Sequence, residues 1–373
     1  SGDSFMILYL SVAVGTVLLA GMVDNHPNIQ SYKTTRQQMC NRLCLVAVFL
    51  ILFALSACRL NVGNDYAKYV EFMHLINCDA YVPTEAGFNL SVRVIYGLSG
   101  FENYLLVFAI YAFATILLFL LAIYEQSDEF PLTYFLFMAL GYYFQTFSTV
   151  RYYLALAAAL YSMKFVIRKQ WLRFVLLVVL GSFFHKSLIV VLPLYVLASV
   201  AWKKWQLAIV ALVCTTFLFM QDFYLKVAVF LYPSYEDTEY LEGGTSYINI
   251  LRCAAVFGLS LFYYRKSIRG NRKMQFYFYL NLGALILYTL CSFLPVISRI
   301  GYYLTVSHIF FLPALIQETE NIKLRRLLRY GMIAAAILYF VLFMGRAYDD
   351  GLRILPYQSF FFHQMVDIIS DRM

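Results

Sequence analysis

Ionisable side chains stand at the ends of apolar segments at four places in this sequence. Arg59 opens the string RLNVGNDYAKY, which directly follows the almost wholly apolar residues 43–58. Comparable junctions surround Arg151 in STVRYY, His185 in FFHKS and Arg299 in ISRIGYY. A charge at membrane depth is costly unless it has a partner or a ligand. These junctions are therefore the first candidates for a functional site.

The residue types at these junctions suit chemistry on a polyanion. An arginine offers a permanently charged fork that matches phosphate oxygens, so several arginines at one level predict a pyrophosphate site. His185 suits proton transfer near neutral pH, and Asp65 is the rival base if burial raises its pKa. The predicted pyrophosphate-binding residues are Arg59, Arg151, Arg252 and Arg299.

Simpler explanations exist for each of these residues. An arginine near the end of a span can extend its side chain to the lipid headgroups. His185 could be a structural histidine that bonds a backbone carbonyl. Asp65 and Glu85 could act as N-caps of two amphipathic helices, predicted over Tyr66–Ile76 and Glu85–Leu98. The set of charges on one membrane face is more specific than any single member.

The composition predicts an all-helical, polytopic membrane protein. The chain of 373 residues is 62% hydrophobic and only 13% charged, with a mean hydropathy of +0.69. A soluble domain would carry about twice that charge. About twelve apolar segments recur at near-membrane length. They are 5–23, 43–58, 104–124, 130–147, 152–167, 171–184, 187–201, 206–220, 248–264, 275–294, 300–316 and 331–345.

The basic residues indicate an orientation. Alternate connections are rich in Lys and Arg, and the positive-inside rule assigns this side to the cytoplasm. The acidic connection at 125–129 is the exception. Both termini then lie outside, and the formal net charge of +8 reflects topology rather than nucleic-acid binding. The basic connections are centred on residues 33–42, 168–173, 203–204, 265–273 and 323–329.

Three larger features fall on the outer side of what we predict to be a single multi-spanning domain, 1–373. They are a first outer loop at 59–103, a second at 221–247 and a tail at 346–373. A pair of neighbouring acidic residues in the first outer loop could hold a divalent cation, but this loop offers only a lone Asp65 and a distant Glu85. No metal is therefore expected, and no cofactor is expected either. The seven cysteines show no metal-ligand spacing, although Cys58 and Cys78 would both face outward and could pair.

The motifs resemble the EpsG-type, Wzy-like bacterial polysaccharide polymerases. That group reads R-x-x-x-G-x-D-Y-x-x-Y-x-x-x-F, then E-P-G-[FY], and this chain has RLNVGNDYAKYVEF followed by EAGF. VRYYLALAAAL at 150–160, the F-H at 184–185 and R-x-x-x-Y at 299–303 follow in the same order. Ala86 replaces the usual proline, and Tyr152 and Tyr153 replace the glutamine or glycine often found after the arginine.

The resemblance implies a GT-C-like glycosyltransferase at the outer face of the bacterial cytoplasmic membrane. It would transfer a growing glycan from undecaprenyl pyrophosphate to the non-reducing end of the next lipid-linked repeat unit. The partners expected are this lipid-linked oligosaccharide and membrane lipids, with a chain-length regulator (a polysaccharide co-polymerase) as a further candidate.

A mechanism follows as an expectation. Arg151 and Arg299 stabilise the leaving pyrophosphate, with Arg59 or Arg252 assisting, and His185 or Asp65 deprotonates the acceptor, giving inversion. Residues expected to shape the sugar or lipid path are Tyr66, Tyr69, Glu85, Tyr302 and Tyr303. A flippase or transporter of lipid-linked oligosaccharide, a glycan ligase and an acyltransferase using His185 remain alternatives.

Overall fold

The chain is helical throughout the part described by the computed structural model, which covers residues 2–25, 36–231, 245–294 and 297–368. Within these ranges there is no strand, only one isolated antiparallel bridge between Arg59 and Ser359. The all-helical class predicted from composition is therefore confirmed. Part of the predicted second outer loop (232–244) and the end of the tail (369–373) lie outside the described residues.

Six helical segments within the described ranges are long and apolar enough to cross a membrane, so this is a multi-pass membrane protein. A seventh forms if α11 (Lys204–Phe219) and α12 (Gln221–Leu231), which meet at a 90° bend, make one broken span. The expected total of about twelve spans stays a prediction. The six segments are α2 (Arg36–Ala57), α5 (Tyr104–Gln126), α8 (Val150–Ile167), α13 with the π-helix η4 (Tyr247–Ile268), α15 with α16 (Ile297–Gln317) and α17 (Ile322–Gly345).

Shorter apolar helices account for several of the remaining predicted segments. They are α1 (Gly2–Ala20), α6 (Phe130–Ala139), α9 (Trp171–Ser182) and α10 (Val191–Ala198), the last preceded by the 3-10 helix η1 (Lys186–Val190). The break between α9 and η1 falls at His185, in the F-H motif at 184–185.

Two compact units make up the chain. The first comprises Ser1–Tyr161, Val179–Leu188 and Thr319–Met373, and the second comprises Ser162–Val178 and Ile189–Glu318. The sequence predicted a single domain spanning residues 1–373. That the two units form one domain stays a prediction.

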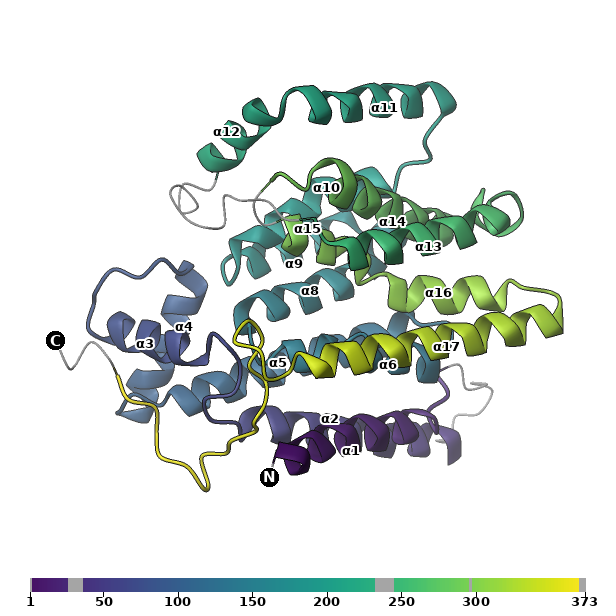
Figure 1. Cartoon of the computed structure of the whole chain (residues 1–373). Helices are drawn as coiled ribbons and strands as arrows, with labels where there is room; N and C mark the ends of the chain where they lie inside the picture. The colour runs from purple at the N-terminus through teal and green to yellow at the C-terminus, as the bar shows by residue number, and fades with distance from the viewer. Residues whose placement is uncertain (1, 26–35, 232–244, 295–296, 369–373) are drawn as a thin grey trace. The chain divides into compact units, whose positions relative to one another are not determined.

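In the first unit, α1, α2, α5, α6 and α17 lie side by side (Figure 1). α1 packs on α2 and α6, α2 packs on α5, and α6 packs on α17. At one end of this layer, Glu129 forms an ion pair with Arg329 at the start of α17. The acidic connection at 125–129 thus meets a basic connection, as expected if both lie on the same side of the membrane.

The two amphipathic stretches of the first outer loop form α3 (Tyr66–Asn77) and α4 (Ala86–Ser99), which pack on each other and, through α4, on α5. α3 buries one face at helical spacing, including Tyr66, Tyr69 and Met73. α4 buries Phe88 and Val92 in the same way, and all five side chains join one apolar cluster with α5. The periodicity of the sequence predicted both helices.

The C-terminal tail is bonded along the RLNVGND segment, an arrangement that the sequence did not indicate. Leu60 N–H donates to the Gln358 carbonyl at 2.8 Å, and Gly63 N–H donates to the Arg353 carbonyl at 2.8 Å. The Arg353 guanidinium also donates to Asn61 Oδ1 at 3.1 Å. The tail therefore fixes the backbone between α2 and α3, which has no regular helix to satisfy it.

The second unit is built around α14 (Arg272–Leu290), which packs against α10, α11, α13, α15 and α16. α15 covers Ile297–Thr305 and α16 covers His308–Gln317. α14 is mostly apolar, but it buries the amide of Asn281 at its middle. A buried polar group requires hydrogen-bond partners, and it marks the polar interior of this unit.

Candidate functional site

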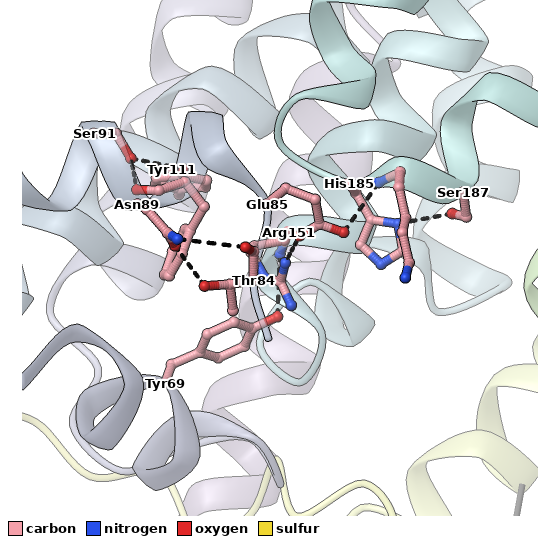
Figure 2. A network of polar contacts seen from close by, with 11 residues as sticks. Tyr69, Thr84, Glu85, Asn89, Ser91, Tyr111, Arg151, His185 and Ser187 are labelled. Carbon is pink, nitrogen blue, oxygen red and sulfur yellow. Dashed lines mark hydrogen bonds and ion pairs between the residues drawn. The ribbon is translucent and has the colours of Figure 1, made fainter. Parts of the chain in front are cut away.

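A partly buried ion pair between Glu85 and Arg151 forms the centre of the candidate site. Glu85 occupies the N-cap position of α4 but makes no capping hydrogen bond. Its Oε2 atom instead pairs with Arg151 Nη1, and its Oε1 atom accepts from the backbone N–H of Lys186 at 3.1 Å (Figure 2). The side chains of Arg151 and Glu85 are only 13% and 15% exposed. One carboxylate thus joins α4, the start of α8 and the turn that carries His185.

Arg151 is the second residue of α8, just after a non-helical break that contains Ser148 and Thr149. The short helix α7 (Tyr142–Gln145) precedes that break. The guanidinium carbon lies 5.3 Å from the ring centre of Phe88 and 5.7 Å from that of Tyr69. These rings stabilise the cation and hold it in place.

One hydrogen-bond donor of the Arg151 guanidinium makes no hydrogen bond to the described residues. Its Nε atom is buried and has no hydrogen-bond partner among the described residues. A buried donor without a partner costs about 1–3 kcal/mol. The dipole at the first turn of a helix also favours an anion, although the Arg151 N–H itself donates to the Tyr69 hydroxyl at 3.4 Å. The start of α8 is therefore suited to bind an anionic oxygen.

His185 lies beside this pair, in the turn between α9 and η1. It is 8% exposed, and its Nδ1 atom lies 2.7 Å from Ser187 Oγ. Its ring packs edge-on against Tyr152 with 5.5 Å between the ring centres. The backbone N–H of the next residue, Lys186, donates to Glu85. This hydrogen bond fixes the turn that carries His185, and so the position of the imidazole, relative to the ion pair.

Arg59 lies elsewhere in the first unit, inside an aromatic cage. It is 2% exposed, its Nη1 donates to the Ser56 carbonyl at 2.8 Å, and its guanidinium lies over Tyr66, Phe108 and Phe147. The cavity beside it has a volume of about 10 Å³, room for about one water. Its surroundings hold this guanidinium in the fold rather than opening it to a large ligand.

Electrostatics in this cage favour a cation beside neutral phenols. Burial lowers the pKa of Arg59, while the neighbouring Tyr66 and Tyr143 raise it. Burial raises the pKa of Tyr66, and Arg59 opposes that shift. A guanidinium keeps its proton in proteins at neutral pH. Arg59 therefore stays charged and is stabilised mainly by its ring contacts and backbone carbonyls.

Asp65 occupies the N-cap position of α3, as one explanation of the sequence predicted, and it is partly exposed. Its side chain makes no capping hydrogen bond, so capping does not account for this carboxylate. The same holds for Glu85, whose carboxylate is bonded to Arg151 and Lys186. Of the two capping explanations, only the positions are confirmed.

The remaining predicted site residues belong to the second unit. Arg252 donates from Nε to His308 Nδ1 at 3.0 Å and from Nη2 to the Thr305 carbonyl at 3.0 Å. His308 Nε2 in turn contacts Asn281 Oδ1 at 2.7 Å. An Nδ1 atom that accepts from a guanidinium must be unprotonated, so Nε2 carries the hydrogen and donates to Asn281. This chain of bonds fixes the neutral imidazole.

α15 carries the other members of the late motif. Arg299 and Tyr302 are partly exposed, whereas Tyr303 is fully buried. The Tyr303 carbonyl accepts from the Tyr195 hydroxyl, which attaches α15 to α10. Tyr303 thus has a packing role in the second unit.

Comparison with known proteins assigns the family. A family model described as the EpsG family matches residues 42–359, most of the chain. The chain belongs to the EpsG family. This membership confirms the predicted resemblance and indicates a polysaccharide-polymerase-like membrane protein. No curated protein and no solved structure matches the chain.

The EpsG family match includes the part of the tail that bonds to the RLNVGND segment. The match continues past the end of α17 to residue 359. Ser359 is the residue whose backbone pairs with Arg59 in the single antiparallel bridge of the described chain. The part of the tail that is bonded to the RLNVGND segment therefore lies within the family match.

Several polar contacts were missed from the sequence. In the first unit they are the amide of Lys186 and the hydroxyl of Ser187. In the second unit, taken separately, it is the His308–Asn281 pair. A polar residue within an apolar span was the available signal for His308 and Asn281. No local pattern identifies a backbone amide as a ligand of a carboxylate 101 residues away.

Gly87 allows α4 to approach the histidine turn. Its N–H donates to the Phe183 carbonyl at 2.8 Å, and a Cβ atom on Gly87 would lie 2.6 Å from that oxygen. Gly87→Ala is expected to push α4 away from the turn and lower the free energy of unfolding by about 1–3 kcal/mol. The matched control is Gly97→Ala on the same helix, where nothing lies within 4 Å.

Thermal unfolding of the detergent-purified variants measures this effect. Gly97→Ala should keep or raise the melting temperature, since alanine favours a helix by about 1 kcal/mol over glycine. Equal melting temperatures for Gly87→Ala and the wild type would contradict the close approach.

Proposed function

We propose that this EpsG-family chain is a polysaccharide polymerase. It transfers a growing glycan from undecaprenyl pyrophosphate to the non-reducing-end hydroxyl of the next lipid-linked repeat unit. The reaction takes place at the outer face of the bacterial cytoplasmic membrane, within a GT-C-like glycosyltransferase architecture. The lipid-linked oligosaccharide and the surrounding lipids are its partners, and a polysaccharide co-polymerase is a candidate regulator of chain length.

The Arg151 site carries this proposal. Arg151 combines a permanent charge, a buried Nε donor without a partner and the start of a helix. Glu85 and two aromatic rings fix its orientation. A leaving pyrophosphate needs donors that are already in place when its negative charge grows. An anion at this position would supply the acceptor that Nε lacks.

The proposed chemistry is a direct displacement. The acceptor oxygen forms a bond to the anomeric carbon of the donor sugar while the bond from that carbon to the pyrophosphate oxygen breaks. Arg151 stabilises the departing pyrophosphate, and His185 takes the proton of the acceptor hydroxyl. A single displacement inverts the anomeric configuration.

Ser187 selects the useful tautomer of His185 in this proposal. If Nδ1–H donates to Ser187 Oγ, the lone pair for the proton lies on Nε2. Asp65 is the alternative base. Glu85 holds Arg151, Tyr66 packs against Arg59, and Tyr69 packs against Arg151.

The other arginines enter with separate expectations. Arg59 maintains the fold around the RLNVGND segment rather than contacting the pyrophosphate, because its guanidinium is enclosed. Arg252 and Arg299 remain proposed pyrophosphate ligands. Tyr302 remains a proposed part of the sugar or lipid path. The chemistry is proposed to be metal-independent, since the Glu85 carboxylate is already bonded to Arg151 and to the Lys186 amide.

The length profile of the cell's lipid-linked glycan tests the function. A null strain is expected to accumulate single repeat units on the outer leaflet, while the wild-type gene restores a ladder. A complete ladder in the null would reject polymerisation. Single units trapped on the inner leaflet would favour the flippase alternative. A normal ladder that is not attached to its final acceptor would favour a ligase. A normal ladder that lacks only its acyl groups would favour an acyltransferase.

A further inference from the structure

A second group of reactive side chains lies in the first unit, at the opposite end of α3 from its N-cap. His74 and Cys78 are one helical turn apart, and Glu102 lies in the connection between α4 and α5. One ligand atom from each residue lies within 4.8 Å of the other two. Cys78 Sγ is 3.6 Å from His74 Nε2, whereas the other ring nitrogen, Nδ1, is 2.9 Å from both Glu102 oxygens. One ion uses only one of these two nitrogens, and it is with a single nitrogen that the three ligand atoms lie within 4.8 Å of one another.

The donor set suits a borderline transition-metal ion. A thiolate, an imidazole and a carboxylate are the three ligand types that Zn²⁺ prefers. Around a tetrahedral ion with bonds of about 2.0–2.3 Å, ligand atoms are about 3.3–3.8 Å apart. The group therefore needs inward movements of only about 1 Å to enclose an ion.

The surroundings help to hold this arrangement. The Asn77 amide donates to Glu102 Oε1 at 2.9 Å, which orients the carboxylate towards α3. The His74 side chain is 13% exposed, whereas Cys78 is exposed at the end of the helix. Cys58 and Cys78 are both free thiols, so Cys78 is not used in the disulfide that the sequence left open. A partly covered imidazole beside an accessible thiol gives a metal ion a route to enter.

We propose that His74, Cys78 and Glu102 bind a zinc ion, with water in the fourth position. The ion joins the C-terminal end of α3 to the connection that leads into α5. α3 and α4 carry Tyr69 and Glu85, which contact Arg151, so the ion stabilises the helix pair that supports the candidate site. The site is structural, and it stands independently of the polymerase reaction.

Cobalt substitution tests the site in the full-length protein purified in detergent and stripped of metal with a chelator. Co²⁺ is expected to bind with a near-ultraviolet thiolate-to-cobalt band and the strong visible absorption of a tetrahedral ion, and Zn²⁺ should abolish both. Cys78→Ser should remove the thiolate band. His74→Gln and Glu102→Gln should each weaken cobalt binding by at least about tenfold.

Cys40→Ser is the matched control, because Cys40 and Cys44 are a second pair of nearby thiols, with 3.9 Å between their sulfur atoms. That variant should keep the spectrum of the wild type. An octahedral, sulfur-free spectrum would report adventitious surface binding and overturn the proposal. A thiolate band that survives Cys78→Ser, or that disappears in Cys40→Ser, would also overturn it.

Discussion

Arg151→Ala is expected to abolish the glycan ladder and leave single repeat units, with a loss of about 10²–10³-fold in the rate of polymerisation. This estimate corresponds to removing one preorganised donor from a developing anion, about 3–4 kcal/mol of barrier. The glycan length profile at matched membrane expression measures it. Arg346→Ala is the control. The Arg346 side chain is 74% exposed at the end of α17, and its ion pair is with Asp349, three residues further along the sequence.

A paired substitution separates catalysis from folding. Arg151→Ala alone leaves Glu85 as a partly buried charge with only the Lys186 amide as its partner, which costs less than the roughly 3–5 kcal/mol of a fully buried, unpaired charge. The double variant Arg151→Gln with Glu85→Gln removes both charges at similar volume. We expect it to be about as stable as the wild type and still inactive. A stable double variant that makes a full ladder would show that the ion pair is structural only.

Arg151→Lys adds a test of geometry. Lysine keeps the charge but loses the planar fork that can bond Glu85 and a phosphate oxygen together. Activity well below that of the wild type is the expected result. Full activity would mean that only the charge matters at this position.

His185→Ala is expected to lower the rate of polymerisation by about 10²–10⁴-fold, the usual contribution of a general base. The variant should still bind the lipid-linked substrate, because Arg151 and Glu85 remain. Polymerisation in reconstituted vesicles under single-turnover conditions measures the chemical step. His363→Ala in the exposed part of the tail serves as the control.

Two further variants distinguish the base from its support. Ser187→Ala should cost about tenfold or less, since Ser187 positions the ring and takes no proton from the substrate. Asp65→Asn should leave most of the activity if His185 is the base. Polymerisation that survives in His185→Ala and is lost in Asp65→Asn would transfer the role of base to Asp65.

The relation of the C-terminal tail to the RLNVGND segment shows a limit of local patterns. The sequence identified the segment as informative and residues 346–373 only as an outer tail. Their contact depends on backbone hydrogen bonds such as the one from Gly63 to Arg353, 290 residues apart. Backbone groups are the same at every residue, so no residue pattern encodes which carbonyl an amide will reach.

Hydropathy and periodicity determined the local features. They predicted the membrane class and the helices α3 and α4, because hydropathy and amphipathic period are set by residues close together in the chain. The order of the short motifs predicted the family. The alternation of apolar segments placed the acidic connection at 125–129 on the same side as the basic connection near Arg329, although its charge was the exception to the basic pattern, and the ion pair between them agrees with a shared side.

Only the tertiary structure decided how the charges are used. The sequence suggested both Arg59 and Arg151 as pyrophosphate ligands, with Arg59 assisting, yet Arg59 is enclosed by aromatic rings, whereas Arg151 pairs with Glu85 and keeps a donor without a partner among the described residues. It treated His74, Cys78 and Glu102 as unrelated, although folding brings them together. Which side chains meet depends on how helices distant in the chain pack. The sequence alone therefore determined which residues carry charge and which segments are helical, whereas long-range packing assigned each charge its partner.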